Sequence, residues 1–349
     1  EEACIDEAAR SLAALPYPNL EVWFINDHST DRTGELLDAV KRDYPRVHVL
    51  HEPPVVEGWF GKSSALWQGF LQADEEHEWL LFADADTVFE PGIVERTVAH
   101  AESERLDFLT CLPRLITKSW GEQLLLPSGW REILQGVPFD RLNDENAYPV
   151  GIGAFMLVRR EAYLAGGGHR ALANWHPDDS LLAAAVKQVG GKMGLAWTPD
   201  LMRIRMYTGY RQIKEYTLRK IRMLYGDGLA MPLAMMGMRL ATMVLPVVMV
   251  AAGVVPQIAS GRFDISLTLL GMLGLGLYVE EVREFNGLNR LVEYHPLIPW
   301  LNPVSGALRI WLSLSLVMHS LLNKPLEWRG RQEFGSAPAA KKRRTPRRV

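Results

Sequence analysis

The sequence is poor in cysteine, with only Cys4 and Cys111 among 349 residues. Two thiols are too few for a disulfide framework or a cysteine-rich zinc site, so we expect a reducing compartment, and any bound metal must use oxygen or imidazole ligands. The G-x-G-x-x-G fingerprint is also absent, which disfavours a soluble hydride-transfer enzyme of the Rossmann type. The glycine-rich turn before Lys62 fails the Walker A spacing, because position 56 is Val.

Excess basic charge is lacking over most of the chain. Residues 324–349 hold nine Lys and Arg against Glu327 and Glu333, a net +7; the whole sequence has a net charge of −3, so the remainder carries −10. Because the basic charge is confined to a terminal tail, we expect no nucleic-acid partner. Two compatible interpretations of the tail stay open: attachment to anionic lipid on the cytoplasmic side of a membrane, or a solvated tail.

Residues 1–225 alternate short apolar segments with amphipathic helical patterns, as expected of an α/β domain with a mostly parallel central sheet. The predicted strands cover 20–26, 46–51, 79–83, 107–112, 154–159 and 192–197. The predicted helices between the first four strands cover about 31–44, 61–75 and 92–103. The sequence begins without an initiator Met, a signal peptide or an opening strand, so we expect the chain to start inside this domain.

Residues 226–323 are predicted to form a helical membrane region. No charged residue occurs between 240 and 261, and roughly 20 apolar residues are enough to cross the hydrocarbon core. The alternative for this run is a buried core helix of a soluble protein. Segments 265–279 and 294–323 can span, re-enter or lie at the interface. If the α/β domain and the tail are both cytoplasmic, the number of crossings is even, so one of the three segments does not span.

The stretch FINDHSTDRT ends an apolar run with polar residues and leads into a helical pattern. Asn26 and Asp27 would therefore lie at the carboxyl edge of the sheet, where α/β folds bind ligands. Helix capping alone explains Ser29, Thr30 and Asp31, but it does not explain Asp27.

A second strand end, LLFADAD, delivers Asp84 and Asp86. Residues two apart in an extended chain point the same way, so both carboxylates can converge on one ligand. A Mg²⁺ or Mn²⁺ ion that also takes diphosphate oxygens needs few protein carboxylates, which suits this pair. A solvated turn is the alternative. Upstream, the turn GWFGKSSAL places Lys62 at the start of a helix, where backbone N–H groups and the ammonium can meet an anion.

A third motif, HPDDSLLAAAVK, places Asp178 and Asp179 in the first turn of a helix. Capping by acids near the positive end of the helix dipole is the structural alternative. The segments 151–153 (Gly-Ile-Gly) and 166–169, which ends at His169, allow close approach of the backbone to a ligand or serve only as turns.

In this order the motifs resemble family 2 glycosyltransferases of the GT-A fold, over about residues 1–220. The resemblance implies that Asn26, Asp27, Lys62 and Asp84 contact a nucleotide sugar and that Asp86 binds a divalent cation, Mg²⁺ or Mn²⁺. Many members of the family have Asp at the position of Asn26, although a neutral amide can still hydrogen-bond a base.

By the same resemblance Asp179 is the catalytic base, and Asp178, His169 and Arg211 lie near the acceptor or the diphosphate. Arg211 falls in the region of the family's Q/R-x-x-R-W motif, but the sequence RMYTGYRQIKEY lacks the Trp. The sequence is most similar to bacterial membrane-bound members, including the carotenoid and hopanoid-associated glycosyltransferases, and more distantly to ceramide glucosyltransferases.

The resemblance implies inverting, metal-dependent transfer from a UDP-sugar to a hydroxyl of a membrane lipid such as a carotenoid or hopanoid. It implies a multi-pass protein of the bacterial inner membrane, in contact with the lipid bilayer, with its catalytic domain in the cytoplasm. Two alternatives stay open: a polyprenyl-phosphate sugar transferase, and a catalytically inactive, membrane-anchored sugar-nucleotide binder. A processive polysaccharide synthase is disfavoured, because the spans are few and the Q-x-x-R-W motif is incomplete.

Overall fold

A computed structural model of the protein describes residues 1–175, 177–225, 228–322, 327–328 and 331–332. The chain forms two compact units. The first comprises residues 1–116 and 136–206; the second comprises 117–135 and 207 onward. Apart from two short strand segments, the basic tail predicted at 324–349 lies outside the described residues.

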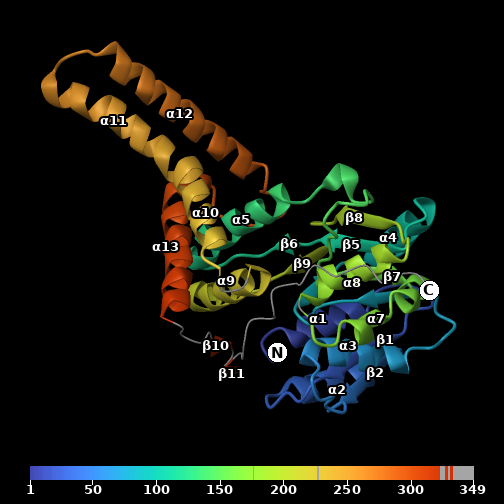
Figure 1. The fold of residues 1–349 in the computed structure, drawn as a ribbon. Helices are drawn as coiled ribbons and strands as arrows, with labels where there is room; N and C mark the ends of the chain where they lie inside the picture. Colours follow the sequence, from blue (N-terminus) through green and yellow to red (C-terminus); the bar gives the residue numbers. More distant parts are fainter. Residues whose placement is uncertain (176, 226–227, 323–326, 329–330, 333–349) are drawn as a thin grey trace, which may run out of the picture. The chain divides into compact units, whose positions relative to one another are not determined.

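The first unit contains all the elements predicted for an α/β domain (Figure 1). Its strands are β1 (Val22–Asn26), β2 (Val47–His51), β3 (Trp79–Phe82), β4 (Thr87–Phe89), β5 (Phe108–Leu112), β6 (Arg114–Leu115), β7 (Met156–Arg159), β8 (Met193–Trp197) and β9 (Met202–Ile204). Its helices are α1 (Ile5–Ala13), α2 (Thr33–Asp43), α3 (Gly61–Gln72), α4 (Ile93–Ser103), η1 (Phe139–Arg141), α6 (Arg160–Ala165), α7 (Gly168–Ala171) and α8 (Asp178–Gln188). The six predicted strands and three predicted helices are each found within three residues of the expected bounds.

The strands pair in both directions, which corrects the expectation of a mostly parallel sheet. In the four-stranded sheet, ordered β3-β7-β5-β8, β7 runs antiparallel to both β3 and β5, whereas β5 and β8 are parallel. Strands β1 and β2 form a separate parallel pair, and β4, β9 and β6 form a mixed three-stranded sheet. An apolar run predicts a strand but not its direction, because both directions bury the same side chains.

Two apolar clusters stabilise the first unit. One joins α1, β1, α2 and β2 around residues such as Leu37 and Val40. The other joins the four-stranded sheet to α8 through Phe108, Tyr163 and Leu182. Each cluster fixes strands whose carboxyl ends carry the acids predicted to bind a ligand.

The second unit is helical. Its elements are α5 (Trp120–Gln135), α9 (Gly209–Tyr225), α10 (Ala230–Arg239), the π-helical turn η2 (Leu240–Val244), α11 (Leu245–Ser260), α12 (Ile265–Asn286), η3 (Pro299–Leu301) and α13 (Asn302–Leu321), followed by the short pair β10 (Glu327–Trp328) and β11 (Arg331–Gln332). Helix α9, which the sequence division placed at the end of the α/β domain, belongs to this unit by its contacts. Helix α12 extends past residue 279, because the charged residues after that point end the apolar run but not the helix.

Helices α11 and α12 form an antiparallel hairpin, shown in Figure 1. Glycines let the two backbones approach closely: a Cβ added at Gly253 would lie 2.5 Å from the backbone nitrogen of Gly271, and one at Gly274 would lie 2.6 Å from the carbonyl of Pro246. Small residues at such contacts are typical of helix pairs in membranes.

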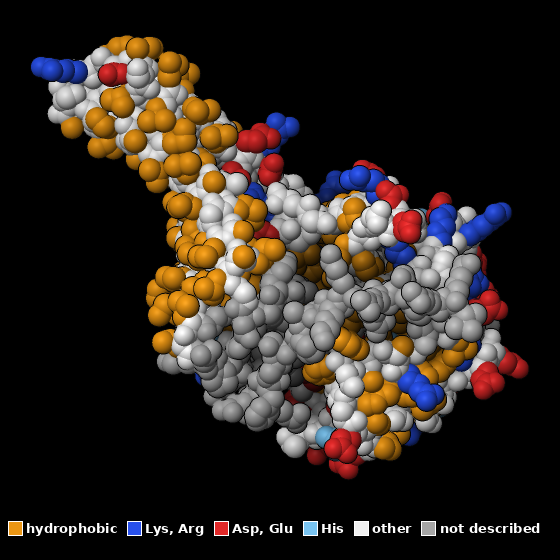
Figure 2. Space-filling model, viewed as in Figure 1, with side chains coloured by type: hydrophobic (Ala, Val, Ile, Leu, Met, Phe, Trp, Pro, Cys, Tyr) orange, Lys and Arg blue, Asp and Glu red, His pale blue; other side chains and the backbone are white. Residues whose placement is uncertain are grey.

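Three helical segments of this unit are long and apolar enough to cross a membrane, by length and composition: Ala230–Ser260, Ile265–Asn286 and Pro299–His319. Most of their apolar side chains are not covered by other parts of the unit, and Figure 2 shows hydrophobic side chains over α10, α11, α12 and α13. A surface of this kind marks an interaction site for lipid or protein.

Candidate functional site

The first loop of the candidate site follows β1. Asp27 lies next to the start of α3, because a Cβ added at Gly61 would come within 2.8 Å of its Oδ2 atom. Its side chain is partly exposed and contacts His28, which has a positive φ of 57°. The loop after β1 and the glycine-rich turn before α3 therefore meet.

Lys62 connects three of the predicted acids. Its Nζ atom lies 2.6 Å from Asp84 Oδ1 and 3.3 Å from Asp178 Oδ2. Burial alone would lower the pKa of this ammonium, but attraction to Asp84 and Asp178, with a contribution from Asp179, outweighs it and raises the pKa. Lys62 is therefore fully charged at neutral pH, and it lies at the first turn of α3, where free backbone N–H groups also favour an anion.

Asp86 lies close enough to these groups to interact with them electrostatically. Burial and the charge of Asp84 raise the pKa of the Asp86 carboxyl to about 7. A bound cation would reverse this penalty. Among the described residues no group of three or more His, Cys, Asp or Glu is arranged to hold a metal. The carboxylates of Asp84 and Asp86 instead fit a hard divalent cation that takes its remaining oxygens from a diphosphate and water.

Two glycines bring the segment before β7 against the acids. A Cβ added at Gly153 would lie 2.9 Å from Asp84 Oδ2 and 3.0 Å from Lys62 Nζ. One added at Gly151 would lie 2.1 Å from the backbone oxygen of Asp179, closer than any real Cβ contact. Glycine is thus required at 151 for close approach to the start of α8, where Asp179 Oδ1 accepts a hydrogen bond from Ser180 N.

His169 lies behind Asp178 and Lys62 in the core. Its Nδ1 atom is 2.9 Å from the hydroxyl of Tyr163, its ring packs edge-on against Phe82, and its side chain is fully buried. Burial, reinforced by Lys62 and opposed by Asp178, lowers the pKa of His169 to about 4. Its Nε2 atom has no hydrogen-bond partner within the described part of the chain. Neutral His169 therefore packs beneath the cluster of acids.

Two predicted residues make other contacts in the structure. The Asn26 side chain turns to His51 on the neighbouring strand, with 3.1 Å between Nδ2 and Nδ1, and is buried. Arg211 lies in the second unit at the start of α9, almost fully exposed, and pairs with Glu215. The structure thus brings together Asp27, Lys62, Asp84, Asp86, Asp178 and Asp179 within one unit.

Sequence reasoning missed three features of the site. The bridge from Lys62 to Asp178 was not expected, because 116 positions separate the two residues. Tyr163, which holds His169, looks in the sequence like an ordinary apolar residue of a helix. The requirement for glycine at 151 was visible only as a Gly-Ile-Gly segment that also suits a turn.

Residues 1–166 match the family model described as Glycosyl transferase family 2. Among curated proteins, a beta-monoglucosyldiacylglycerol synthase of Synechocystis sp. is 36% identical over 88 residues, which are 25% of this chain and 18% of that protein. The 4,4'-diaponeurosporenoate glycosyltransferase of Staphylococcus aureus (strain MRSA252) is 27% identical over 212 residues, 60% of this chain and 52% of that protein. The chain thus spans about half, or less, of the length of these relatives.

The solved structure of the mannosyltransferase PcManGT from Pyrobaculum calidifontis, in complex with GDP-Man and Mn²⁺, aligns with a TM-score of 0.50 at 15% identity. The alignment covers 93% of this chain and 85% of that one. The fold is accordingly a GT-A glycosyltransferase fold with mixed sheets, followed by a helical region with three apolar helices. Residues 1–166, just under half of the chain, are therefore similar to glycosyl transferase family 2, and this region includes FINDHSTDRT and the two acids that follow β3.

Proposed function

We propose that the protein transfers a sugar from a UDP-sugar to the hydroxyl of a membrane lipid, with inversion at the anomeric carbon. The match of residues 1–166 to the model of glycosyl transferase family 2 supports the reaction class. The observation that carries the proposal is the cluster formed by Lys62 with Asp84 and Asp178, which gathers side chains from the first turn of α3, the end of β3 and the start of α8.

The donor end of the reaction needs positive charge. Lys62 and the N-terminus of α3 present a fixed ammonium and backbone N–H groups to the diphosphate. Asp84 and Asp86 would hold a Mg²⁺ or Mn²⁺ ion, which supplies charge neutralisation as negative charge builds on the β-phosphate oxygen. PcManGT, a mannosyltransferase with this fold, is described with GDP-Man and Mn²⁺, which supports a nucleotide sugar and a divalent cation here. Asp27 lies beside Gly61, at the start of α3, and would contact the uracil or ribose.

The acceptor end needs a base. We assign this role to Asp179, whose carboxylate would take the proton as the hydroxyl oxygen bonds to the anomeric carbon. The bond from that carbon to the β-phosphate oxygen breaks in the same step, and UDP leaves. A single displacement of this kind inverts the configuration. Asp178 is tied to Lys62 at 3.3 Å, so it positions the start of α8.

The acceptor is proposed to be a lipid because the relatives are named for lipid and carotenoid substrates and because the second unit contains three helices able to span a membrane. We place the protein in the bacterial inner membrane as a multi-pass protein with a cytoplasmic catalytic domain. A membrane region in the same chain delivers an amphiphile's hydroxyl to the enzyme at high local concentration.

The test is transfer by membranes that contain the full chain, supplied with a panel of UDP-sugars and analysed for glycosylated lipid by mass spectrometry. Asp179→Asn should reduce transfer by roughly 10²- to 10⁴-fold, the usual contribution of a general base, while UDP binding is retained. Asp200→Asn, which neutralises an exposed acid of the same unit, is the matched control. Transfer within a few-fold of wild type in Asp179→Asn would reject this base.

The same assay separates the alternatives. Labelling only of polyprenyl phosphate would indicate a polyprenyl-phosphate sugar transferase. Binding of UDP-sugar without any transfer or hydrolysis would indicate an inactive binder.

A further inference from the structure

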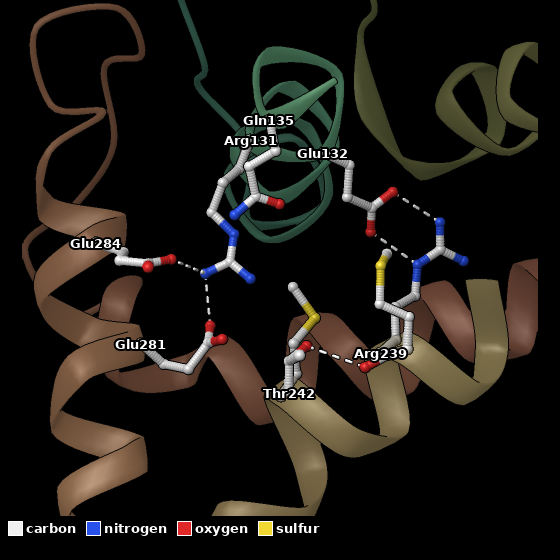
Figure 3. Close-up of a pocket in the computed structure, with 9 residues that line it drawn as sticks. Arg131, Glu132, Gln135, Arg239, Thr242, Glu281 and Glu284 are labelled. Carbon is white, nitrogen blue, oxygen red and sulfur yellow. Dashed lines mark hydrogen bonds and ion pairs between the residues drawn. The ribbon is translucent and has the colours of Figure 1, made fainter. Parts of the chain in front are cut away.

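A second polar site lies within the helical unit, between α5, α12 and the junction of α10 with η2. It is a pocket of about 220 Å³. Figure 3 shows Arg131 and Glu132 entering it from α5, Glu281 and Glu284 from α12, and Arg239 and Thr242 from the other side. Charged groups among apolar helices are costly, and in membrane proteins they usually line a functional cavity.

One wall of the pocket is a complete ion-pair network. Arg239 donates to both oxygens of Glu132, at 2.8 and 2.9 Å, and Arg309 donates to the same carboxylate at 2.5 and 3.2 Å. The third nitrogen of the Arg239 guanidinium, Nη1, donates to the hydroxyl of Ser313 and to the backbone carbonyl of Arg309. Although burial alone would raise the pKa of Glu132, the two arginines lower it to about 2. These groups are satisfied, so this wall is structural.

The opposite wall is incomplete. Arg131 is 7% exposed, and among the described residues a single nitrogen, Nη1, makes both of its ion pairs, to Glu281 and, at 3.7 Å, to Glu284. Its Nε atom is buried and has no hydrogen-bond partner in the described part of the chain. An unpaired buried donor costs stability unless another group meets it. Within the residues that the structure describes, the half-exposed side chain of Glu284 makes only the long contact to Arg131, so it keeps acceptor capacity on the same side.

The charge of the pocket selects among ligands. Its lining contains three carboxylates and two guanidinium groups, and a third guanidinium, from Arg309, neutralises Glu132. An anionic phosphate would face the carboxylates of Glu281 and Glu284 and would have to displace them from Arg131. A hydroxyl carries no charge and can both accept from a guanidinium and donate to a carboxylate. The free groups therefore suit a neutral, hydroxylated ligand.

The surroundings of the pocket are apolar. Leu240 and Leu245, which follow Arg239 in the chain, and Leu277, one turn before Glu281 in α12, are each about half exposed. These residues lie on segments that are long enough to cross a membrane. A ligand with its polar end in the pocket would have its apolar part against these helices, which is the geometry of a lipid rather than of a free polyol.

We propose that this pocket binds the uncharged, hydroxyl-bearing head group of a membrane lipid, with Arg131 Nε donating to a hydroxyl oxygen and Glu284 accepting from a hydroxyl. The proposal goes beyond the transfer reaction, because binding here requires neither a nucleotide sugar nor the acids of the first unit.

The test uses the full chain in phosphatidylcholine nanodiscs that contain a diacylglycerol with a diazirine in one acyl chain. Photolabelling of peptides from α5, α10 to η2, or α12 should be saturable and competed by unlabelled diacylglycerol. Thr242→Trp, which fills the pocket without changing its charge, should reduce labelling at least about tenfold. Thr268→Trp is the matched control, because Thr268 lies near the other end of α12 and does not line the pocket.

A second variant separates ligand binding from a purely structural ion pair. Arg131→Lys keeps the positive charge beside Glu281 but removes the Nε donor, so it should weaken labelling by roughly tenfold, as for loss of a hydrogen bond to a charged group. Labelling that is unsaturable or unchanged in both pocket variants would overturn the proposal. If phosphatidic acid competes as well as diacylglycerol, the preference for an uncharged head group is wrong. If free glycerol competes as well as diacylglycerol, the ligand need not be a lipid and that part of the proposal is wrong. Each variant must first give the circular dichroism spectrum of wild type.

Discussion

The closest backbone approach in the candidate site makes Gly151→Ala the most informative single substitution. The added methyl carbon would lie 2.1 Å from the backbone oxygen of Asp179 and 2.4 Å from its carbonyl carbon. An ordinary van der Waals contact begins at 3.4 Å. Side-chain rotation cannot relieve this clash, because both partners are backbone atoms.

The separation of the two segments must therefore grow by roughly 1 Å, and a misplacement of that size can cost about 10²-fold in rate. The start of α8 is held by Leu182, Ala183 and Val186, which are fully buried. Either the Gly151 segment or Asp179 must shift, and either shift changes the position of the proposed base relative to the segment before β7. We expect kcat for transfer to fall by roughly 10²-fold, with little change in UDP affinity.

Gly153→Ala is the comparison variant, because the same methyl group there meets side-chain atoms instead of backbone atoms. The three atoms nearest its methyl carbon would be the two carboxylate oxygens of Asp84 and Lys62 Nζ, the ends of side chains that can adjust. We expect it to weaken nucleotide binding and to leave the base in place. Measuring kcat, KM for the UDP-sugar and UDP affinity on both variants separates the two effects. If Gly151→Ala folds, binds UDP and transfers sugar at the wild-type rate, the placement of Asp179 as the base is wrong.

Three further predictions test the remaining parts of the structure. Lys62→Gln removes the ammonium that pairs with Asp84 and Asp178, so it should weaken UDP binding by about tenfold or more and tighten Mn²⁺ binding by the nucleotide-free protein. Calorimetry measures both affinities, and unchanged values would contradict the bridging role of Lys62. Glu132→Gln leaves two buried guanidinium groups without their carboxylate, so it should lower the free energy of unfolding by roughly 3–5 kcal/mol, whereas Glu145→Gln on the surface should have little effect in the same thermal melts. His169→Gln should flatten the pH dependence of the free energy of unfolding. Burial lowers the pKa of His169 from 6.5 to about 4, so between these pH values the unfolded chain binds a proton that the folded chain does not, and wild type should lose up to about 3 kcal/mol of stability as the pH falls through this range. Parallel stability curves for the two proteins would refute this.

Local sequence patterns predicted much of the fold and of the site. Strand ends and helix starts are encoded by neighbouring residues, so Asp84, Asp86, Asp178 and Asp179 could be assigned to loop edges from the sequence. Their approach to one another follows from the fold, and the resemblance to a known family supplied it. The roles assigned to these residues remain proposals.

What the sequence did not predict depends on contacts between distant segments. The direction of β7 is set by its pairing with β3 and β5, not by its own residues. Asn26 turned to His51 because the register of β1 and β2 places the two opposite each other. The Glu132 network joins residues separated by 107 and 177 positions, and each of its arginines looks in the sequence like an isolated charge in an apolar run.

The route of the chain through α5 has a consequence for truncation. The polypeptide leaves the first unit after residue 116, contributes α5 to the helical unit, and returns at residue 136. A fragment that stops at residue 206 would keep α5 but lose its packing partners, exposing Leu125 and Leu126 and leaving Glu132 without either arginine. A water-soluble fragment of the first unit therefore requires a redesigned α5. Exchange of helical regions between relatives at one junction would separate α5 from the helices against which it packs.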